Sequence, residues 1–376
     1  MTHPAPIQLF RPVVSEDAIN AVAEVLRSGW IGLGPKTAEF ERAFAVYVGA
    51  RHAVGVSSAT AALHLALIVH DVGEGDEVLT TPLTFVSTNH VILYQKAVPV
   101  FVDVDPQTLN LDLTAAEACV TARTKAIMVV HYGGNPLDLD RLYAFAARHR
   151  LAVIEDAAHA CGARWRGRRI GGFGTTCFSF HAVKNLPMGD GGMVTVQDEK
   201  LWQRLNTMRW LGIDRSTFDR NKAVYQWEYE VSEVGYKYHM NDIAAVIGLA
   251  HLTELDKWNA RRAEIVTLYR KHLADLAPAV RFVSTTPGAE SANHLCAIFV
   301  ENRDQVVDGL RQRGVNVGVH YKPNHHYKPY RDFVRAPLPQ ADAAFQRLIS
   351  LPLHLLLQDG DVERVCQTLR DSLVFH

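Results

Sequence analysis

The sequence predicts an α/β fold with a large domain, built on a mostly parallel mixed sheet flanked by helices, and a smaller α+β domain. Short, nearly continuous apolar runs rich in β-branched residues recur through the first half of the chain. Such runs are typical of strands that are covered on both faces. Helical patterns lie between several of them, which favours parallel pairing. From Asn241 onward the pattern changes to long helical stretches with fewer strand candidates.

The first predicted elements alternate between helix and strand. Residues 15–29 repeat apolar side chains at helical intervals, with Ser15 as the expected N-cap and Gly29 as the expected end. A helix, a short buried strand and an alanine- and leucine-rich helix follow at residues 37–49, 53–58 and 59–73.

Further apolar runs complete the expected sheet. They lie at residues 76–82, 97–105, 125–132, 151–158, 176–181 and 192–196. A helix is expected between two of them, at residues 137–150.

The second domain is expected to follow a long helical pattern, straight or kinked, that begins at Asn241. We divide the chain into a large domain, residues 1–254 with the N-terminal segment, and a small domain, residues 255–376. Strand candidates in the small domain lie at residues 279–284, 293–300 and 315–321, and helices are expected at residues 303–313, 340–349 and 361–373.

Composition excludes several classes of function. The chain has 376 residues and a formal net charge of -1, so no excess of positive charge indicates nucleic acid or an anionic membrane as a partner. No apolar run reaches the roughly 18 residues of a membrane span. The N-terminus has no pattern of a secretory signal. The five cysteines form no C-x-x-C pair, which indicates reduced thiols and a cytoplasmic location.

One lysine stands in an unusual context. Lys184 lies in SFHAVKNLPMGDGGMV, after an apolar run and before a glycine-rich turn. Burial lowers the pKa of a lysine and frees its amine to bind an aldehyde. Asp156 ends a predicted strand, where ligands bind in open α/β sheets. A lysine that holds the aldehyde and a carboxylate that keeps the pyridine nitrogen protonated are what pyridoxal 5'-phosphate requires.

Two further features fit that cofactor. Ser58, Ala59 and Thr60 lie between a strand and a helix, where free backbone N–H groups bind a phosphate. Phe85 follows a strand end and would stack on a ring. Each feature alone is more often structural, as an N-cap, an ion-pair partner, a solvated lysine or a core aromatic residue. Their combination favours a cofactor site.

The chain resembles the DegT/DnrJ/EryC1/StrS sugar aminotransferases, which have the fold-type I architecture of pyridoxal-phosphate enzymes. The resemblance covers almost the whole chain. Its blocks include VGVSSATAALHLAL, VIEDAAHACGARW, FSFHAVKNLPMGDGGMV, GYKYHMNDIAAVIGLAHL, GVHYKPNHH and LISLPLH.

The resemblance implies roles for individual residues. Lys184 would form the Schiff base, Asp156 would pair with the pyridinium nitrogen and Phe85 would stack on the ring. His159 would lie on the side of the cofactor's 3-oxygen. The phosphate would be held by Ser58, Ala59, Thr60, Ser179 and, from the partner subunit of a homodimer with a shared active site, Lys237. Ala59 departs from the glycine usual in this turn, and Lys237 replaces the asparagine of many members. A tyrosine-rich packing segment is the alternative interpretation of GYKYHM.

The implied reaction moves an amino group from L-glutamate to a nucleotide-linked keto-sugar, of the 4-keto-6-deoxy type or a relative. Candidate sugar and nucleotide contacts are Trp30, Tyr238, His320, Tyr321 and His325. The alternatives are a cyclitol aminotransferase that uses glutamine, a non-catalytic cofactor-binding regulatory protein and a dehydratase, and the presence of Lys184 argues against the last. No metal is expected, because no carboxylate or cysteine lies at ligand spacing from the histidines of VHYKPNHHYKPY. GRRIGGFG is interpreted as a turn and not as a dinucleotide fingerprint.

Overall fold

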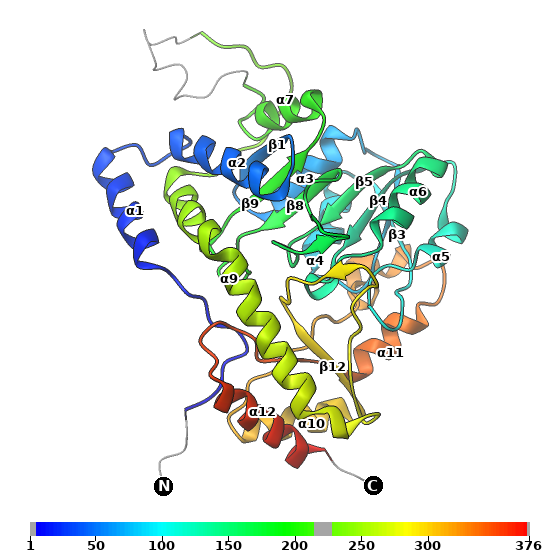
Figure 1. Ribbon diagram of the computed structural model, residues 1–376. Coiled ribbons are helices and arrows are strands. Elements are labelled where there is room, and N and C mark those ends of the chain that lie inside the picture. The colour runs from blue at the N-terminus through cyan, green and yellow to red at the C-terminus, as the bar shows by residue number, and fades with distance from the viewer. Residues whose placement is uncertain (1–4, 214–227, 374–376) are drawn as a thin grey trace.

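The computed structural model describes residues 5–213 and 228–373, in two parts joined by one long helix (Figure 1). The larger part contains a seven-stranded sheet of order β1-β9-β8-β5-β4-β2-β3. All neighbours pair in parallel except those of β9, which runs antiparallel to both β1 and β8. The predicted mostly parallel mixed sheet is therefore confirmed.

The strands of this sheet lie where the apolar runs predicted them. They are β1 (His52–Val56), β2 (Glu77–Thr80), β3 (Val98–Phe101), β4 (Thr124–Val130), β5 (Ala152–Asp156), β8 (Thr175–Ser179) and β9 (Gly192–Val196). Because both faces of the sheet are covered, successive side chains of one strand enter different cores. Val153 packs in one cluster and Ile154 in another.

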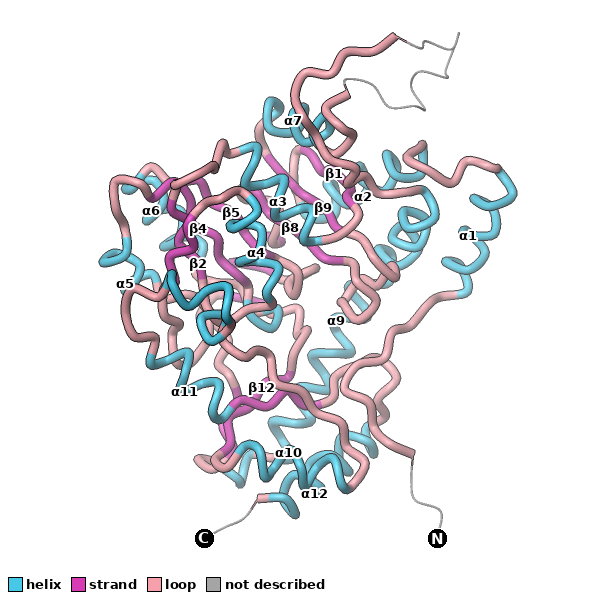
Figure 2. The backbone as a smooth tube through the Cα atoms, turned by 180° about the vertical axis from the view of Figure 1, so that it is seen from behind, coloured by secondary structure: helices cyan, strands magenta, loops and turns pink. Residues whose placement is uncertain are grey.

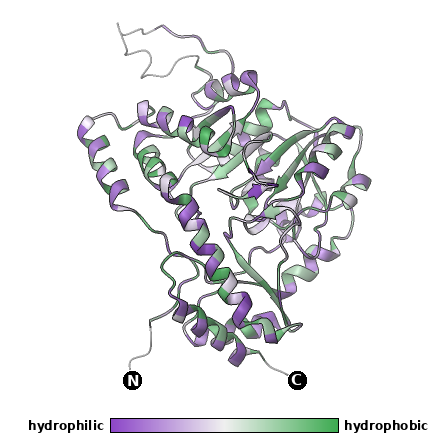
Figure 3. Cartoon of the chain, in the orientation of Figure 1, coloured by the Kyte–Doolittle hydropathy of each residue, from purple (hydrophilic) through white to green (hydrophobic). Residues whose placement is uncertain are grey.

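Helices cover both faces of the large sheet. The apolar cluster on one face includes residues of α2 (Pro35–Val48), α6 (Leu139–His149) and α9 (Asp242–His272). The cluster on the other face includes residues of α3 (Ala59–Val69), α4 (Val86–Tyr94) and α7 (Glu199–Met208). Figure 2, the view from the opposite side to Figure 1, shows these three helices. In Figure 3 the strands are mostly green, while helices at the edge of the molecule carry purple, hydrophilic residues.

Caps fix both ends of the first helix as the sequence predicted. α1 (Glu16–Ser28) starts at Ser15, whose side chain accepts the N–H of Ala18, and ends at Gly29, which has a positive φ of 74°. The remaining short helical elements of this part are α5 (Leu113–Ala116), η1 (Glu117–Cys119) and η2 (Tyr132–Gly134).

The smaller part has its own sheet and core. β12 (Cys296–Val300) pairs antiparallel with β10 (Val280–Phe282) and with β13 (Leu348–Leu351). α9 crosses from the large sheet to this core without a break, so the division expected at residues 254 and 255 falls inside a helix. Ile7 joins the same core from the N-terminal segment.

A small third sheet joins β11 (Ala289–Glu290) to β6 (Arg164–Trp165) and β7 (Arg168–Arg169), which lie in the chain between β5 and β8 of the larger part. The other elements of the smaller part are helical. The helical elements are η3 (Ala274–Leu276), α10 (Arg303–Gln312), η4 (Asn324–His326), η5 (Lys328–Phe333), α11 (Pro339–Arg347) and α12 (Asp359–Ser372). No helix among the described residues is long and apolar enough to cross a bilayer.

Three expectations about local structure were wrong or incomplete. Residues 315–321 form no strand; only isolated bridges join Val315 to Ile7 and Gly318 to Ser350. The third strand of the small sheet is instead β13. The helix expected at residues 340–349 ends at Arg347, and β13 begins at the next residue, Leu348. GRRIGGFG begins within the β6–β7 hairpin and includes β7.

Candidate active site

Lys184 and Asp156 meet at one edge of the large sheet. Asp156 is the last residue of β5, and Lys184 lies in the connection between the neighbouring strand β8 and β9. The Asp156 carboxylate is buried and accepts the Thr88 hydroxyl at 2.8 Å and the N–H of Ala158 at 3.0 Å. It also interacts electrostatically with Lys184.

Burial changes the acidity of both groups. Desolvation lowers the pKa of Lys184 to about 8, although the charge of Asp156 opposes this shift. Desolvation raises the pKa of Asp156, while its two hydrogen bonds and the Lys184 ammonium act in the opposite direction. Near neutral pH a far larger fraction of Lys184 than of an exposed lysine is therefore the free amine.

His159 and Tyr321 form one wall beside this pair. The Gly133 N–H donates to His159 Nδ1 at 3.3 Å, and His159 Nε2 lies 3.0 Å from the Tyr321 hydroxyl. Burial, together with the Lys184 charge, lowers the pKa of His159 well below its usual range, so the imidazole is neutral. The Tyr321 ring centroid lies 6.2 Å from that of Phe85.

His320 and His294 extend the wall. His320 Nδ1 lies 2.8 Å from the Ser350 hydroxyl, and burial, together with the Lys184 charge, lowers the pKa of His320 to about 4. The His294 and His159 ring centroids are 4.4 Å apart. His294 also contacts Asn185, the residue after Lys184, at 3.0 Å.

The Ser58–Thr60 turn lies at the start of α3, where the sequence predicted it. Ser58 is the N-cap and accepts the N–H of Ala61 at 3.1 Å. The Thr60 hydroxyl donates to Ser87 in the first turn of α4 at 2.9 Å. Because Thr88 of the same turn binds Asp156, the N-termini of α3 and α4 are linked to the carboxylate.

Ser179 and Phe85 also come to this edge. Ser179 ends β8 and is paired with Gly192 of β9, which is paired in turn with Val56 of β1, two residues before Ser58. A Cβ atom at Gly192 would lie 2.5 Å from the Ser58 carbonyl, so this approach requires glycine. Phe85 is the N-cap residue of α4 and is 57% exposed.

Four predicted residues have partners of their own. Trp30 Nε1 donates to the Leu33 carbonyl at 3.2 Å, and the Lys237 ammonium lies 3.6 Å from the Trp210 ring centroid. The Tyr238 hydroxyl contacts His64 at 3.2 Å. The backbone carbonyl of Tyr238 accepts the Ser57 N–H at 2.7 Å, which places this segment beside the Ser58 turn. His325 contacts Asp342, as described next.

The reason for expecting no metal was wrong. Asp342 of α11 supplies the carboxylate that the sequence spacing lacked, because its Oδ1 lies 3.0 Å from His325 Nε2 and 2.8 Å from His326 Nε2. Among the described residues these three side chains form a group with the spacing of metal ligands.

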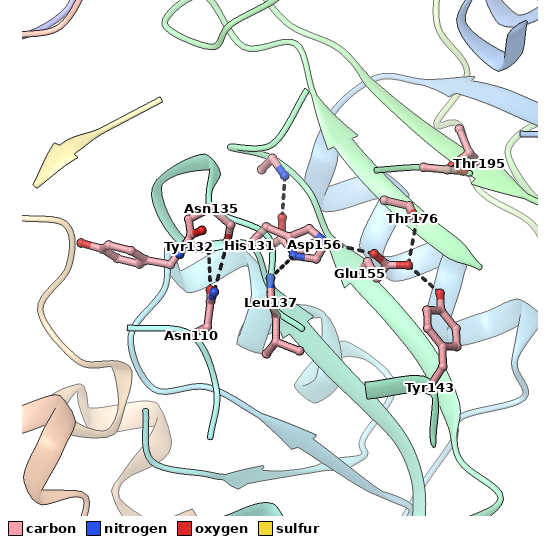
Figure 4. A network of polar contacts seen from close by, with 12 residues as sticks. Asn110, His131, Tyr132, Asn135, Leu137, Tyr143, Glu155, Asp156, Thr176 and Thr195 are labelled. Carbon is pink, nitrogen blue, oxygen red and sulfur yellow. Dashed lines mark hydrogen bonds and ion pairs between the residues drawn. The ribbon is translucent and has the colours of Figure 1, made fainter. Parts of the chain in front are cut away.

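A buried network supports the strand that ends in Asp156 (Figure 4). Glu155 is fully buried and accepts hydrogen bonds from Tyr143 at 2.6 Å and Thr176 at 3.3 Å. His131 Nδ1 accepts the Leu137 N–H, so its Nε2 carries the hydrogen that it donates to Glu155 at 2.9 Å. These contacts fix the backbone next to Asp156.

Sequence reasoning missed Thr88, His294 and Asn185. Thr88 had a signal, because it follows Phe85 by three residues in a segment that turned out to be a helix. Asn185 adjoins Lys184, and its amide group donates to Asn259 and to the Ala292 carbonyl, both at 2.7 Å. His294 comes from a distant segment and had no local signal.

The residues at this edge fit pyridoxal 5'-phosphate. A buried lysine with a lowered pKa and a buried carboxylate beside it match the aldehyde and the pyridinium nitrogen of that cofactor. The capped helix start beside Gly192 matches a phosphate. Fold and site together define a pyridoxal-phosphate-dependent aminotransferase.

Comparisons with known proteins agree. The model of the DegT/DnrJ/EryC1/StrS aminotransferase family matches residues 12–370, and the chain belongs to this family. It is 38% identical to the uncharacterized protein MJ1066 of Methanocaldococcus jannaschii over 371 residues, 96% of each chain.

Two solved structures are also similar. The putative sugar aminotransferase Spr1654 of Streptococcus pneumoniae, in its PMP form, has a TM-score of 0.92 and 32% identity, covering 97% of this chain and 98% of that one. AtS13 of Actinomadura melliaura has a TM-score of 0.91 and 38% identity, covering 98% and 100%.

Proposed function

We propose that this aminotransferase moves an amino group from L-glutamate to a nucleotide-linked keto-sugar of the 4-keto-6-deoxy type or a relative. The observation that carries the proposal is the buried pair of Lys184 and Asp156 at the edge of the sheet. Membership of the family and the similarity to Spr1654, a putative sugar aminotransferase, support a sugar as the acceptor.

Lys184 is proposed to bind the cofactor and to move the proton. When bound, pyridoxal phosphate supplies an electron sink for the carbon that loses its proton. The Nζ atom of Lys184, partly neutral near its pKa of about 8, takes the α-proton of the donor and later returns a proton to the product. The carboxylate of Asp156 holds the proton on the ring nitrogen.

Other residues are proposed to hold the cofactor in place. Ser58, Ala59, Thr60 and Ser179 bind the phosphate at the start of α3. Phe85 covers the ring face, and His159 orients the side of the 3-oxygen.

The acceptor sugar is proposed to lie against Tyr321 and His320. His320 interacts electrostatically with Lys184, and the Tyr321 hydroxyl contacts His159 beside it. Tyr238, Trp30 and His325 are proposed to bind the more distant parts of the substrate. The contact of Tyr238 with the Ser57 backbone supports its nearness to the site.

We propose a homodimer with a shared site. The segment before Lys237 exposes large apolar side chains, with Val234 90% and Val231 55% exposed, as expected of an interface. Lys237 would reach the partner's phosphate site by leaving its contact with Trp210. The five free cysteines fit a cytoplasmic enzyme.

The test uses the purified protein loaded with the cofactor. We expect absorbance at roughly 420 nm that L-glutamate removes and a keto nucleotide sugar restores. Lys184→Ala abolishes the loss of colour while the protein stays folded. Colour that persists with glutamate and with every amino donor would indicate a regulatory protein, and loss with glutamine but not glutamate would indicate a cyclitol aminotransferase.

A further inference from the structure

Two histidines and an aspartate converge where η4 meets α11. His325 and His326 are consecutive residues of η4, and Asp342 lies on α11. The Nε2 atoms of His325 and His326 lie 3.0 and 2.8 Å from the same oxygen, Oδ1 of Asp342. The three possible ligand atoms all lie within 4.8 Å of one another. One histidine would be enough to pair with a carboxylate, so the second gives the cluster the composition of a metal site.

Packing holds the two imidazole rings in place. The His325 ring centroid lies 6.5 Å from that of Phe101, and the His326 centroid lies 6.1 Å from that of Phe345. The two imidazole centroids are 4.2 Å apart, with their planes at 76°. Because neighbouring rings fix both histidines, their Nε2 atoms point to one place before any ion binds.

The cluster is negatively charged and open to solvent on one side. The strongest acidic influences on His325 come from Asp342 and Asp103. The Asp103 carboxylate accepts two backbone N–H groups at the start of α11, each at 2.9 Å, so it supplies charge rather than a ligand. The side chain of His325 is 9% exposed, that of His326 32% and that of Asp342 46%. An ion can therefore reach the three ligands from solvent.

We propose that His325, His326 and Asp342 bind a divalent transition-metal ion such as Zn²⁺. Two imidazoles and one carboxylate suit zinc, whereas magnesium and calcium prefer oxygen ligands alone. Zinc ligands at about 2.0–2.1 Å from the ion lie about 3.3 Å apart in a tetrahedral site. The half-exposed Asp342 side chain would thus withdraw by a few tenths of an ångström, and water would take the fourth position.

The bound ion would join η4 to α11 and fasten the segment that follows His320 and Tyr321. Each histidine would bind through Nε2 as a neutral ring with its hydrogen on Nδ1. Nδ1 of His325 is buried without a hydrogen-bond partner, and the lack of such support weakens metal sites by about 10–100-fold. The ion is therefore exchangeable. Because Nε2 of His325 cannot hold zinc and substrate together, its proposed substrate contact applies to the metal-free protein.

Zinc itself is the probe, added to the cofactor-loaded protein after treatment with a chelator and its removal. Isothermal titration calorimetry should show binding of Zn²⁺ with which Mg²⁺ does not compete. X-ray absorption of the complex should find two imidazole nitrogens at about 2.0–2.1 Å from the metal. Free zinc at about 100 times its Kd should raise the melting temperature by roughly 3 °C.

Variants at the two more exposed ligands locate the site. His326→Gln and Asp342→Asn should each weaken zinc binding at least about tenfold and remove the rise in melting temperature. His149→Gln is the matched control. His149 Nε2 lies 2.9 Å from a carboxylate oxygen of Glu117, and this pair belongs to no metal-ligand group among the described residues. The control should bind zinc like the wild type.

Melting temperatures without zinc show whether each variant folds, and if one does not, the other decides. Zinc binding of wild-type strength in the folded variants would overturn the proposal, because the ion would then lie elsewhere. The absence of zinc binding in the wild type would overturn it as well, as would equal competition by Mg²⁺. None of these measurements needs turnover, so their failure would leave the proposed aminotransferase reaction untouched.

Discussion

His159 donates the hydrogen on its Nε2 to the hydroxyl oxygen of Tyr321 across 3.0 Å. The direction follows from the other nitrogen, because Nδ1 accepts the N–H of Gly133 and the ring is neutral. Burial raises the pKa of Tyr321, so the phenol keeps its own hydrogen and can donate it to another acceptor. The pair thus presents one oriented hydroxyl donor beside Lys184.

Removing that oxygen should cost stability through His159. Tyr321→Phe leaves the buried Nε2–H without an acceptor, and we expect the free energy of unfolding to fall by about 1–3 kcal/mol. Chemical denaturation of the apoprotein measures this. In a His159→Leu background the Nε2–H is already absent, so the same change at Tyr321 should cost clearly less. Equal costs in both backgrounds would contradict the assigned hydrogen bond.

The lowered pKa of Lys184 should make stability depend on pH. Between pH 8 and 10.5 the unfolded chain carries a proton on this lysine that the folded protein does not carry. The free energy of unfolding therefore rises with pH in this window, by at most about 1.4 kcal/mol per unit for one group. We expect the apoprotein to gain stability relative to Lys184→Met from pH 8 to 10.5. Parallel curves for the two proteins would refute the shift.

The sequence could predict the large sheet because its strands are apolar on both faces and short. It could not predict α4, since Val86–Tyr94 is rich in β-branched residues and has buried side chains without a clear amphipathic face. β13 follows α11 directly, and its apolar residues continued the apparent helix. Val315 and Gly318 have strand-like neighbours but pair only at single bridges.

The site residues that directly follow a predicted strand could be found from the sequence. Asp156 and the Ser58 turn come directly after buried strands, and Lys184 lies just beyond β8. Arg262 and His294 reach the same region from α9 and from the segment before β12, and only tertiary packing brings them there. The carboxylate that meets His325 escaped notice for the same reason, because Asp342 is seventeen residues away.

Asp156→Asn should lower the pKa of Lys184 further, since the Asp156 charge now raises it. We expect the rate at which acetic anhydride acetylates Lys184 in the apoprotein to level off about one pH unit lower than in the wild type. Mass spectrometry of the Lys184 peptide follows the reaction. Thr88→Val is the control, because it removes a hydrogen bond but keeps the charge. Profiles that level off at the same pH for Asp156→Asn and the wild type would disprove the coupling.

The buried carboxylate of Glu155 should matter more than any one of its donors. Tyr143→Phe removes one hydrogen bond and should lower the free energy of unfolding by about 0.5–1.5 kcal/mol, whereas Glu155→Gln leaves a donor unpaired and should cost about 1–3 kcal/mol. Urea denaturation measures both. Glu117→Gln, at an exposed carboxylate that contacts His149 at 2.9 Å, should change stability by less than about 1 kcal/mol. If Glu155→Gln lowers the free energy of unfolding by no more than Glu117→Gln does, the buried network does not contribute to stability.

Gly192→Ala should distort the Ser58–Thr60 turn, which is the proposed phosphate site, although Gly192 itself does not bind the phosphate. The new Cβ would lie 2.5 Å from the Ser58 carbonyl and 2.8 Å from the Ala59 nitrogen, so the turn at the start of α3 must move. We expect a loss of about 1–3 kcal/mol in stability from the overpacking and weaker binding of pyridoxal phosphate, measured by titrating the apoprotein. Gly360→Ala is the matched control, because a Cβ there meets nothing within 4 Å and α12 accommodates alanine. Gly192 has no side chain that could touch the cofactor, so any effect on binding must act through the Ser58 turn. If Gly192→Ala keeps both the cofactor affinity and the melting temperature of the wild type, the Ser58 turn can shift without consequence. That result would remove the Ser58 turn from the phosphate site.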